Sequence, residues 1–286
     1  MKAVAVLLSL VLVLAANAIE TPFIIEGDGQ SLSSIELLIS EIEAGSILIL
    51  GELHDNTAHH SNQLEVIQAL IAQGHQVDLG MEFLNYTDQY EIYKYSSGLI
   101  SKGEFLKSIN WKTPDTFEFY SPMIEAVSKN DGSVLGLNIP RAITSKVAKR
   151  GVNSLTNSEL VLLPHPLEYG NKLYFERFYQ AVGGEHVPDN KIENYFWSQS
   201  MWDDVMSWKA LEFVQKNPES VLVIIVGDFH VSYGGGLGEI FRRKGFSNIK
   251  TVSQIKKGDA TDSELNQELT PHVKYGRRAD WIWVTK

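Results

Sequence analysis

Short apolar runs recur along the chain, and their lengths predict buried strands. Four runs are clear: Ser46–Leu50, Gln76–Met81, Ser133–Leu137 and Val221–Val226. The first and last are almost continuously aliphatic, as is typical of parallel-sheet strands that are covered on both faces. Two weaker strand patterns follow at Asn248–Ser253 and Trp281–Thr285.

Helical patterns alternate with these strands. In His59–Gln73, the side chains of Leu64, Ile67 and Ile71 form one apolar stripe, and Gly74 is suited to end the helix. Further helical segments are Phe117–Lys129, Arg141–Lys149, Asn190–Gln215 and Gly236–Lys244. The alternation predicts an α/β fold with a mostly parallel central sheet flanked by helices.

Two stretches interrupt the alternation. Residues from about 86 to 116 and from about 154 to 205 are mostly helical and rich in aromatic residues. We interpret them as helical insertions over one edge of the sheet, within a single domain that spans residues 19–286. The polar stretch Lys256–Thr270 is expected to be a solvated loop or a short helix.

The first 18 residues have the pattern of a secretory signal peptide. Lys2 gives a basic start, residues 3–15 are apolar, and Ala16-Asn17-Ala18 has small residues around a cleavage point. The apolar run is too short to cross a bilayer of roughly 30 Å. We therefore expect cleavage after Ala18 and a periplasmic or secreted protein.

Charge and cysteine content narrow the functional classes. The net charge of -10 disfavours nucleic acid as a partner, because phosphate binding needs a concentrated basic surface. The chain has no cysteine, which excludes disulfides, thiolate ligands, covalent c-type haem and a lipidated cysteine. We therefore expect no lipid anchor, and a periplasmic location suits an exported protein without disulfides.

Polar groups follow each of the four clear strands. They are Glu52 and His54 after the first strand, Glu82 after the second, Asn138 and Arg141 after the third, and Asp228 and His230 after the fourth. In a parallel sheet these groups emerge at one edge, where open α/β sheets place their sites. The plain alternative is that they hydrogen-bond loops together or cap helices. Taken together, the set favours a functional site.

The residue types at this edge suit a metal ion held by nitrogen and oxygen. His59, His60 and Gln63 lie on the first turns of the following helix, near the same edge. The expected ligands of Zn, Mn or Fe are Glu52, His54, His59, Glu82 and His230. Such a metal could activate water for hydrolysis, with Glu52 or Glu82 as the catalytic carboxylate. The chain has neither a G-x-S-x-G nor an H-E-x-x-H motif, which disfavours serine hydrolases and zincins.

Ten aromatic residues lie between Tyr169 and Trp208, more than short helices need for packing. Some belong to a core, but the others could line a pocket for a flat apolar ligand. Tyr174 and Tyr179 could offer a phenolate to a metal, and His165 and His186 bracket the segment. A glycine-rich run at residues 234–238 could contact an anion or make a tight turn, and it lacks the spacing of a dinucleotide loop.

Five motifs together resemble one family. They are GELHDNTAHHSNQ (51–63), GMEFL (80–84), GLNIPR (136–141), QSMWDDVM (199–206) and VGDFHVSYGGGLG (226–238). This set is similar to the ChaN-like haem-binding proteins of Gram-negative bacteria, and it covers most of the chain after the leader. That family lies in a wider superfamily with erythromycin esterases and Tiki/TraB-type proteins.

The resemblance implies an iron-regulated envelope protein that binds haem b non-covalently and assists haem or iron uptake or trafficking. It also implies a homodimer in which two haems stack face to face, each ligated by a tyrosine, and an outer-membrane haem receptor as a further partner. The residues carried over by motif are Glu52, His54, His59, Gln63, Glu82, Asn138, Arg141, Asp228 and His230. The cofactor-binding candidates are Tyr174, Tyr179, His165, His186 and Arg141. Members of the family are often lipoproteins, and the lack of cysteine departs from that pattern.

Haem binding without enzymatic activity is the favoured hypothesis. The alternative is a metal-dependent hydrolase that uses the carboxylates and histidines at the strand ends. A third hypothesis is a structural or interaction module with a vestigial site. The strand-end cluster and the aromatic segment could also form two separate sites in one chain.

Overall fold

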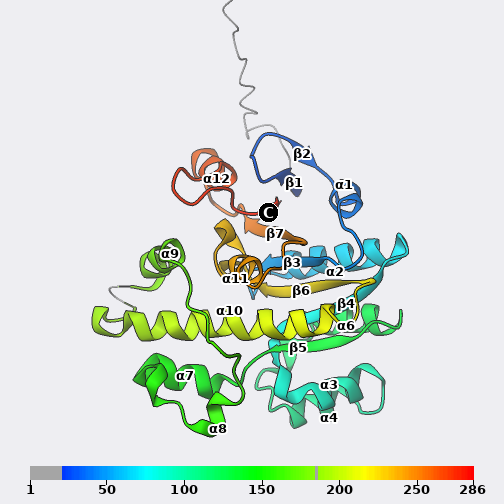
Figure 1. The fold of residues 1–286 in the computed structure, drawn as a ribbon. Helices are drawn as coiled ribbons and strands as arrows, with labels where there is room; N and C mark the ends of the chain where they lie inside the picture. The colour runs from blue at the N-terminus through cyan, green and yellow to red at the C-terminus, as the bar shows by residue number, and fades with distance from the viewer. Residues whose placement is uncertain (1–20, 184–185) are drawn as a thin grey trace, which may run out of the picture.

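A computed structural model describes residues 21–183 and 186–286. The expected signal peptide, residues 1–18, lies outside the described residues. Eight strands form one sheet in the order β2-β1-β8-β7-β3-β6-β4-β5 (Figure 1).

The core of the sheet is parallel, as predicted. Its strands are β3 (Ile47–Glu52), β4 (Gln76–Asn85), β5 (Val134–Asn138), β6 (Ser220–Gly227), β7 (Ile249–Lys256) and β8 (Trp281–Thr285). All six predicted strands are therefore present, and each pairs in parallel with its neighbours in this part of the sheet. Every residue of β3 and β6 is buried, in agreement with their continuous aliphatic runs.

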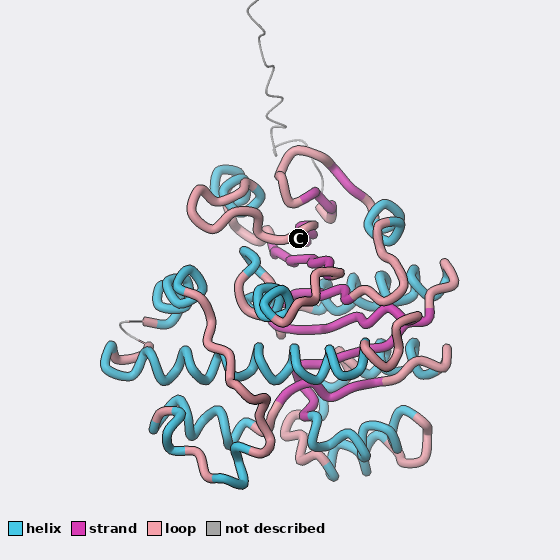
Figure 2. Tube along the Cα trace, viewed as in Figure 1, coloured by secondary structure: helices cyan, strands magenta, loops and turns pink. Residues whose placement is uncertain are grey.

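Helices cover both faces of the sheet (Figures 1 and 2). On one face lie α1 (Ile35–Ser40), α2 (Thr57–Ala72) and α6 (Ser121–Ser128), which share a core with alternate residues of β3, β4 and β6. On the other face lie α10 (Ile192–Val214) and α11 (Leu237–Arg243), which pack on the remaining residues of these strands. The predicted α/β architecture of a mostly parallel sheet between helical layers is confirmed.

The structure differs from the sequence prediction at the edges and in element boundaries. Two short strands were not predicted, β1 (Phe23–Glu26) and β2 (Leu32–Ser33), and β1 pairs antiparallel with β8. The helix expected over Phe117–Lys129 is split into α5 (Pro114–Phe117) and α6, whose second residue is Pro122. A proline is tolerated in the first turn of a helix but not in its interior, so α6 begins there.

The first aromatic-rich stretch lies beside the β5 edge of the sheet, whereas residues 172–182 of the second lie against the segment that follows β6 and not over that edge. Residues 86–116 contain α3 (Gln89–Ser96) and α4 (Lys102–Ser108), and α3 contacts β5. After α7 (Arg141–Arg150), the second stretch contains α8 (Asn157–Leu160), α9 (Lys172–Val182) and the first half of α10. The polar stretch after β7 contains α12 (Asp262–Leu269), which begins with a capping box at Thr261. Within the described residues, no helix has both the length and the apolarity needed to cross a membrane.

Candidate functional site

The carboxyl ends of β3, β6 and β4 lie side by side and open into a cleft with two connected lobes. The larger cavity has a volume of about 880 Å³, and the adjoining one has about 470 Å³. His54, Glu82 and Trp202 line both cavities, so we treat the two as one strand-end cleft. Polar groups that follow the strands in the sequence therefore line a cavity at this sheet edge.

Glu52 is the centre of one polar network in this cleft. Its carboxylate is 1% exposed and accepts hydrogen bonds from the Tyr120 hydroxyl at 2.9 Å and the Gln63 amide at 2.9 Å. His54 Nδ1 lies 3.3 Å from Oε1 of the same carboxylate, while its side chain is 60% exposed. His60 Nδ1 lies 3.2 Å from Oε2, without the geometry of a hydrogen bond. The buried Glu52 carboxylate thus orients the exposed imidazole of His54.

These contacts fix the protonation states. Burial alone would raise the pKa of Glu52, but the hydrogen bond from His54 and the nearby His60 outweigh it and lower that pKa to about 2. The hydrogen bond to Glu52 raises the pKa of His54. Burial, together with the Glu52 charge, raises the pKa of the Tyr120 phenol, so Tyr120 remains a hydrogen-bond donor.

His230 is the centre of a second network. Its Nδ1 lies 2.7 Å from Asp203 Oδ1, and its Nε2 lies 3.5 Å from Glu82 Oε1. The other oxygen of Asp203 accepts a hydrogen bond from the Tyr174 hydroxyl at 3.0 Å. The Gln199 amide donates to that hydroxyl at 2.9 Å. Asp203 is fully buried and His230 is 5% exposed, so the pair is shielded from water.

The charge of His230 follows from these partners. Burial would lower its pKa, but Asp203 and Glu82 together raise that pKa well above the ordinary value. Burial would raise the pKa of Glu82, but the positive charge of His230 lowers it. We infer an imidazolium held between two carboxylates at neutral pH.

Gly227 allows the two networks to approach one another. Its backbone N–H donates to Glu82 Oε2 at 2.7 Å. A Cβ atom at this position would lie 2.8 Å from His54 Cε1 and 3.7 Å from Glu82 Oε2. A larger residue would push the His54 ring away from the strand end, while the distance to Glu82 is an ordinary contact, so only glycine leaves His54 in place.

Two arginines, Arg177 and Arg278, also line the larger cavity. Arg278 contacts two carboxylates and a hydroxyl: Nη2 lies 2.7 Å from Asp228 Oδ2, Nε donates to Ser253 Oγ at 2.7 Å, and Nη1 contacts Glu268. Arg177 is only 9% exposed and donates to the backbone oxygen of Ser232 at 2.6 Å and to its hydroxyl at 2.7 Å.

His59 does not face the cleft, although the sequence predicts it as a metal ligand. Its Nδ1 accepts the backbone N–H of Leu53 at 3.0 Å, and its Nε2 faces Thr285 Oγ1 at 3.3 Å. Burial lowers the pKa of His59 to about 4, which leaves a neutral imidazole that holds two strand ends together.

The other four predicted metal ligands, Glu52, His54, Glu82 and His230, line the larger cavity. Within the part of the chain that the structure describes, no three His, Asp or Glu side chains are arranged to hold a metal ion. The metal site therefore gains no support.

Residues 38–239 match the model of a family described as haem-binding uptake, Tiki superfamily, ChaN. The chain belongs to this ChaN-like haem-binding family. The matched segment includes Glu52, Glu82, Asp203 and His230, whereas Arg278 lies beyond it.

One solved structure in particular shares this fold. ChaN of Campylobacter jejuni, described with cofacial haem bound, matches with a TM-score of 0.68 and 19% identity over 93% of this chain and 97% of that chain. The type III effector HopBA1 matches with a TM-score of 0.47 and 12% identity over 88% of this chain and 93% of that chain. The erythromycin esterase EreC matches with a TM-score of 0.49 and 13% identity over 84% and 78% of the two chains. No curated protein matches significantly.

The two tyrosines predicted as ligands in this family member have different surroundings. Tyr174 is 1% exposed and its hydroxyl is held between Asp203 and Gln199. Burial raises its pKa well above the ordinary value. Tyr179 is 42% exposed on α9 and donates to Asp189 at 3.0 Å. Neither hydroxyl is free in this arrangement.

The other cofactor-binding candidates lie at the surface. His165 is exposed and its Nε2 lies 3.1 Å from the backbone oxygen of Leu160. His186 is exposed in the turn after α9. Arg141 is exposed at the start of α7 and lines the smaller cavity of the cleft. Of these three residues, only Arg141 lines the strand-end cleft.

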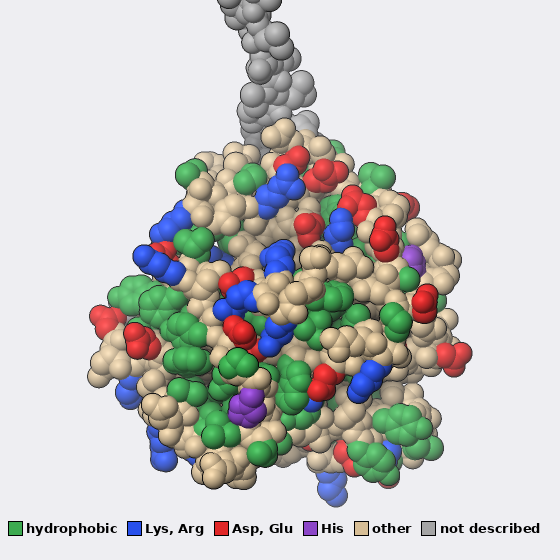
Figure 3. Space-filling view, viewed as in Figure 1, with side chains coloured by type: hydrophobic (Ala, Val, Ile, Leu, Met, Phe, Trp, Pro, Cys, Tyr) green, Lys and Arg blue, Asp and Glu red, His purple; other side chains and the backbone are tan. Residues whose placement is uncertain are grey.

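An apolar wall closes one side of the larger cavity. It consists of Phe178, Ala181 and Val182 of α9 together with Trp202 and Phe229. Outside the cavity, Leu173 and Tyr179 on the same helix are each 42% exposed. Hydrophobic side chains gather on this part of the surface (Figure 3). The aromatic segment therefore forms both a wall of the cleft and an apolar surface beside it.

Several groups in the networks were not identified from the sequence. They are Tyr120, Arg177, Gln199, Asp203, Ser253 and Arg278. One signal was available, because Asp203 and Asp204 interrupt a long helix among apolar residues, and buried charges need partners. Asp204 has a structural role, since it accepts the Glu168 N–H at 2.7 Å and lies 2.8 Å from Lys244 Nζ.

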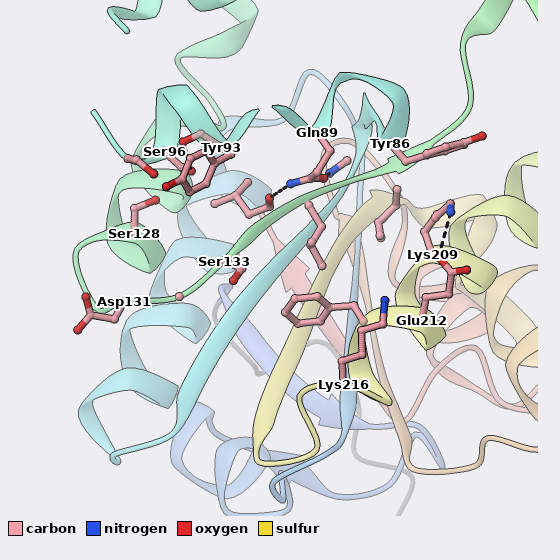
Figure 4. Close-up of a pocket in the computed structure, with 17 residues that line it drawn as sticks. Tyr86, Gln89, Tyr93, Ser96, Ser128, Asp131, Ser133, Lys209, Glu212 and Lys216 are labelled. Carbon is pink, nitrogen blue, oxygen red and sulfur yellow. Dashed lines mark hydrogen bonds and ion pairs between the residues drawn. The ribbon is translucent and has the colours of Figure 1, made fainter. Parts of the chain in front are cut away.

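A further cavity of about 720 Å³ lies beside the edge strand β5, between α3 and the end of α10 (Figure 4). We call it the edge groove. Gln89 spans its floor, because its amide nitrogen donates to Val134 O at 2.7 Å and its oxygen accepts from Gly136 N at 3.0 Å. Lys209 and Glu212 form an ion pair of 3.0 Å on the opposite wall.

Proposed function

We propose that this protein binds haem non-covalently in the strand-end cleft and serves haem or iron uptake or trafficking in the bacterial envelope. The family match over residues 38–239 supports haem as the ligand. The similar Campylobacter jejuni protein is described as binding haem cofacially.

The observation that carries the proposal is the larger cavity of about 880 Å³, which combines an apolar wall with buried cations. Haem is a flat apolar ring with two carboxylates at one edge. Phe178, Trp202 and Phe229 can contact the ring face, and Arg177 lies in the same cavity for the carboxylates. The donor set therefore fits haem b better than a bare metal ion.

A tyrosine is the proposed iron ligand, and Tyr174 and Tyr179 remain the candidates. A phenolate ligand supplies a site from which haem can later be released. Tyr174 would have to leave its contacts with Asp203 and Gln199, and Tyr179 would have to leave Asp189. Within the same proposal, His165, His186 and Arg141 are outer contacts of the cofactor.

We also propose a homodimer with stacked haems, a periplasmic location after cleavage at Ala18, and transfer of haem from an outer-membrane receptor. The exposed Leu173 and Tyr179 beside the cleft support a second copy at this face, since an apolar surface next to a site is typical of an interface.

The test is a titration with haemin of the protein that lacks residues 1–18, in which the absorbance between about 350 and 700 nm is recorded after each addition. We expect a saturable Soret band with a tyrosinate charge-transfer band. Tyr174→Phe or Tyr179→Phe should remove the charge-transfer band if that residue is the ligand. If neither change alters the spectrum, both ligand assignments fail. Non-saturating absorbance of the wild type would contradict haem binding itself.

Hydrolysis is a second candidate, because two carboxylate-oriented histidines face one cavity. His54 is exposed and held by Glu52, which suits a general base, while the charged His230 suits the stabilisation of a developing negative charge. This pair could act on an ester without a metal. Glu52→Gln should then lower the rate of ester hydrolysis about a hundredfold when equal concentrations of folded protein are compared. Hydrolysis that is unchanged in Glu52→Gln would contradict this candidate.

A further inference from the structure

Arg177 is a buried cation without a carboxylate partner among the described residues. It is 9% exposed, and two of its nitrogens donate only to Ser232, at 2.6 Å and 2.7 Å. Arginine carries five N–H donors and stays charged in proteins. Three of these donors therefore have no partner among the described residues, although the side chain lines the larger cavity. A buried charge that no contacting carboxylate balances is costly, which favours an anionic ligand at this position.

The aromatic rings around Arg177 hold its guanidinium in place. Its Cζ lies 4.9 Å from the centre of the Phe229 ring and 4.8 Å from that of Tyr233. Cation–π contacts stabilise the charge without using the N–H donors. The guanidinium is therefore fixed in position while its remaining donors stay available to a ligand.

The other charges of the cavity place an anion at this end. Glu52, Glu82 and Asp55 also line the cavity and would repel a carboxylate, and the His230 imidazolium beside Glu82 is already paired with Asp203 and Glu82. Arg278 lines the same cavity, but Asp228 and Glu268 balance its charge. Among the described residues Arg177 contacts no carboxylate, so it is the arginine of this cavity whose charge is left unbalanced.

We propose that Arg177 is the anion-recognition residue of the strand-end cleft and that it binds a carboxylate of an apolar ring-bearing ligand. The inference rests on the proposed haem function and assigns the residue that holds a propionate. An arginine suits this role because its planar fork matches the two oxygens of a carboxylate.

The test compares three probes on the protein without residues 1–18: haemin, metal-free protoporphyrin IX, and haemin dimethyl ester, whose carboxylates are blocked. The variants are Arg177→Met, which keeps the length of the side chain, and Arg177→Lys, which keeps its charge. Arg150→Met is the matched control, because Arg150 is exposed in the last turn of α7 and does not line the cleft. Thermal unfolding of each variant reports on folding.

We expect Arg177→Met to weaken haemin and protoporphyrin binding by roughly ten- to a hundredfold, since charge-assisted hydrogen bonds are lost. The dimethyl ester should bind Arg177→Met and wild type equally, Arg177→Lys should recover part of the affinity, and Arg150→Met should match wild type. The inference is overturned if Arg177→Met binds haemin as tightly as wild type does, or if it weakens the ester equally. Failure of the wild type to bind haemin at all would instead remove the proposed function.

Discussion

The strand-end cleft and the edge groove have similar volumes but hold their polar groups in different ways. The larger lobe of the cleft has about 880 Å³ and the groove about 720 Å³. In the cleft, Glu52 and Asp203 are at most 1% exposed and each is bonded to several partners. In the groove, Lys216 and Asp131 are exposed, and Glu212 is 44% exposed in its ion pair (Figure 4).

The difference bears on which cavity is the better candidate for a ligand site. A buried charge is kept only where partners or a ligand compensate its loss of hydration, so a cluster of buried charges favours a functional role for the cavity. The polar groups of the groove have another explanation. The Gln89 side chain hydrogen-bonds two backbone groups of the edge strand β5, which would otherwise be free to pair with a further strand. Volume alone does not separate the two cavities.

The largest effect should come from breaking a buried pair in the cleft. Asp203→Asn leaves His230 without its closest counter-charge and should lower the free energy of unfolding by about 3 to 5 kcal/mol. Glu212→Gln in the groove removes an exposed ion pair and should cost less than about 1 kcal/mol. Urea unfolding near neutral pH measures both. Equal costs in the two variants would erase the distinction between the cavities.

The acid limb of the stability curve should report on Glu52. Its folded pKa of about 2 is below the unfolded value of 4.5, so its contribution is present above the unfolded pKa and is lost as the pH falls toward 2. At about 1.4 kcal/mol per pKa unit, this contribution is about 3 kcal/mol. The difference in unfolding free energy between wild type and Glu52→Gln should narrow by about 2.5 kcal/mol between pH values of about 5.5 and 2.5, and the rest is lost below the folded pKa. A difference that stays constant with pH would contradict the assigned pKa.

Much of the fold could be predicted from the sequence. The aliphatic runs of β3 and β6 are readable because both faces of a central strand are buried. The two-residue β2 and the four-residue β1 were missed, since β1 pairs with β8 at the distant carboxyl terminus and β2 pairs with β1. Such short strands have no local pattern of their own.

Only the site residues that lie near the ends of strands in the sequence could be predicted. Glu52, His54, Glu82 and His230 come directly after β-strands or at their ends, so sheet topology brings them together. Tyr120 reaches its partner Glu52 from the turn before α6, and Asp203 and Arg177 lie on helices, where a side chain's direction depends on how the helix packs. The role of Tyr174 could not be inferred either, because the sequence does not reveal that its hydroxyl faces Asp203.

Removal of the Gln89 side chain should have a moderate effect on stability. Gln89→Ala loses two hydrogen bonds to β5 and should lower the free energy of unfolding by about 1 to 2 kcal/mol. It should also promote concentration-dependent association, because the edge strand becomes available for pairing. Urea unfolding and sedimentation velocity measure the two effects. Gln68→Ala, at an exposed position of α2, is the control, and an equal response of both variants would refute the role of Gln89.

The smallest expected effect concerns the charge balance around Arg177. Glu268 is 46% exposed and paired with Arg278, so Glu268→Gln removes one negative charge near the arginine end of the cleft. Haemin affinity should rise about two- to fivefold, the size expected of an exposed charge. Titration at low ionic strength measures it. Weaker haemin binding by this variant would contradict an anion at this end.

The central claim is that haem occupies the strand-end cleft, and filling each cavity in turn tests it most directly. Ala181 lines the cleft and Ser97 lines the edge groove, and both are exposed enough to accept a tryptophan. The haemin dissociation constant is measured for Ala181→Trp, Ser97→Trp and wild type. We predict binding at least about tenfold weaker in Ala181→Trp and unchanged in Ser97→Trp, because only the first fills the ligand's space. Unchanged binding in Ala181→Trp with weakened binding in Ser97→Trp would place haem in the edge groove and contradict the proposal.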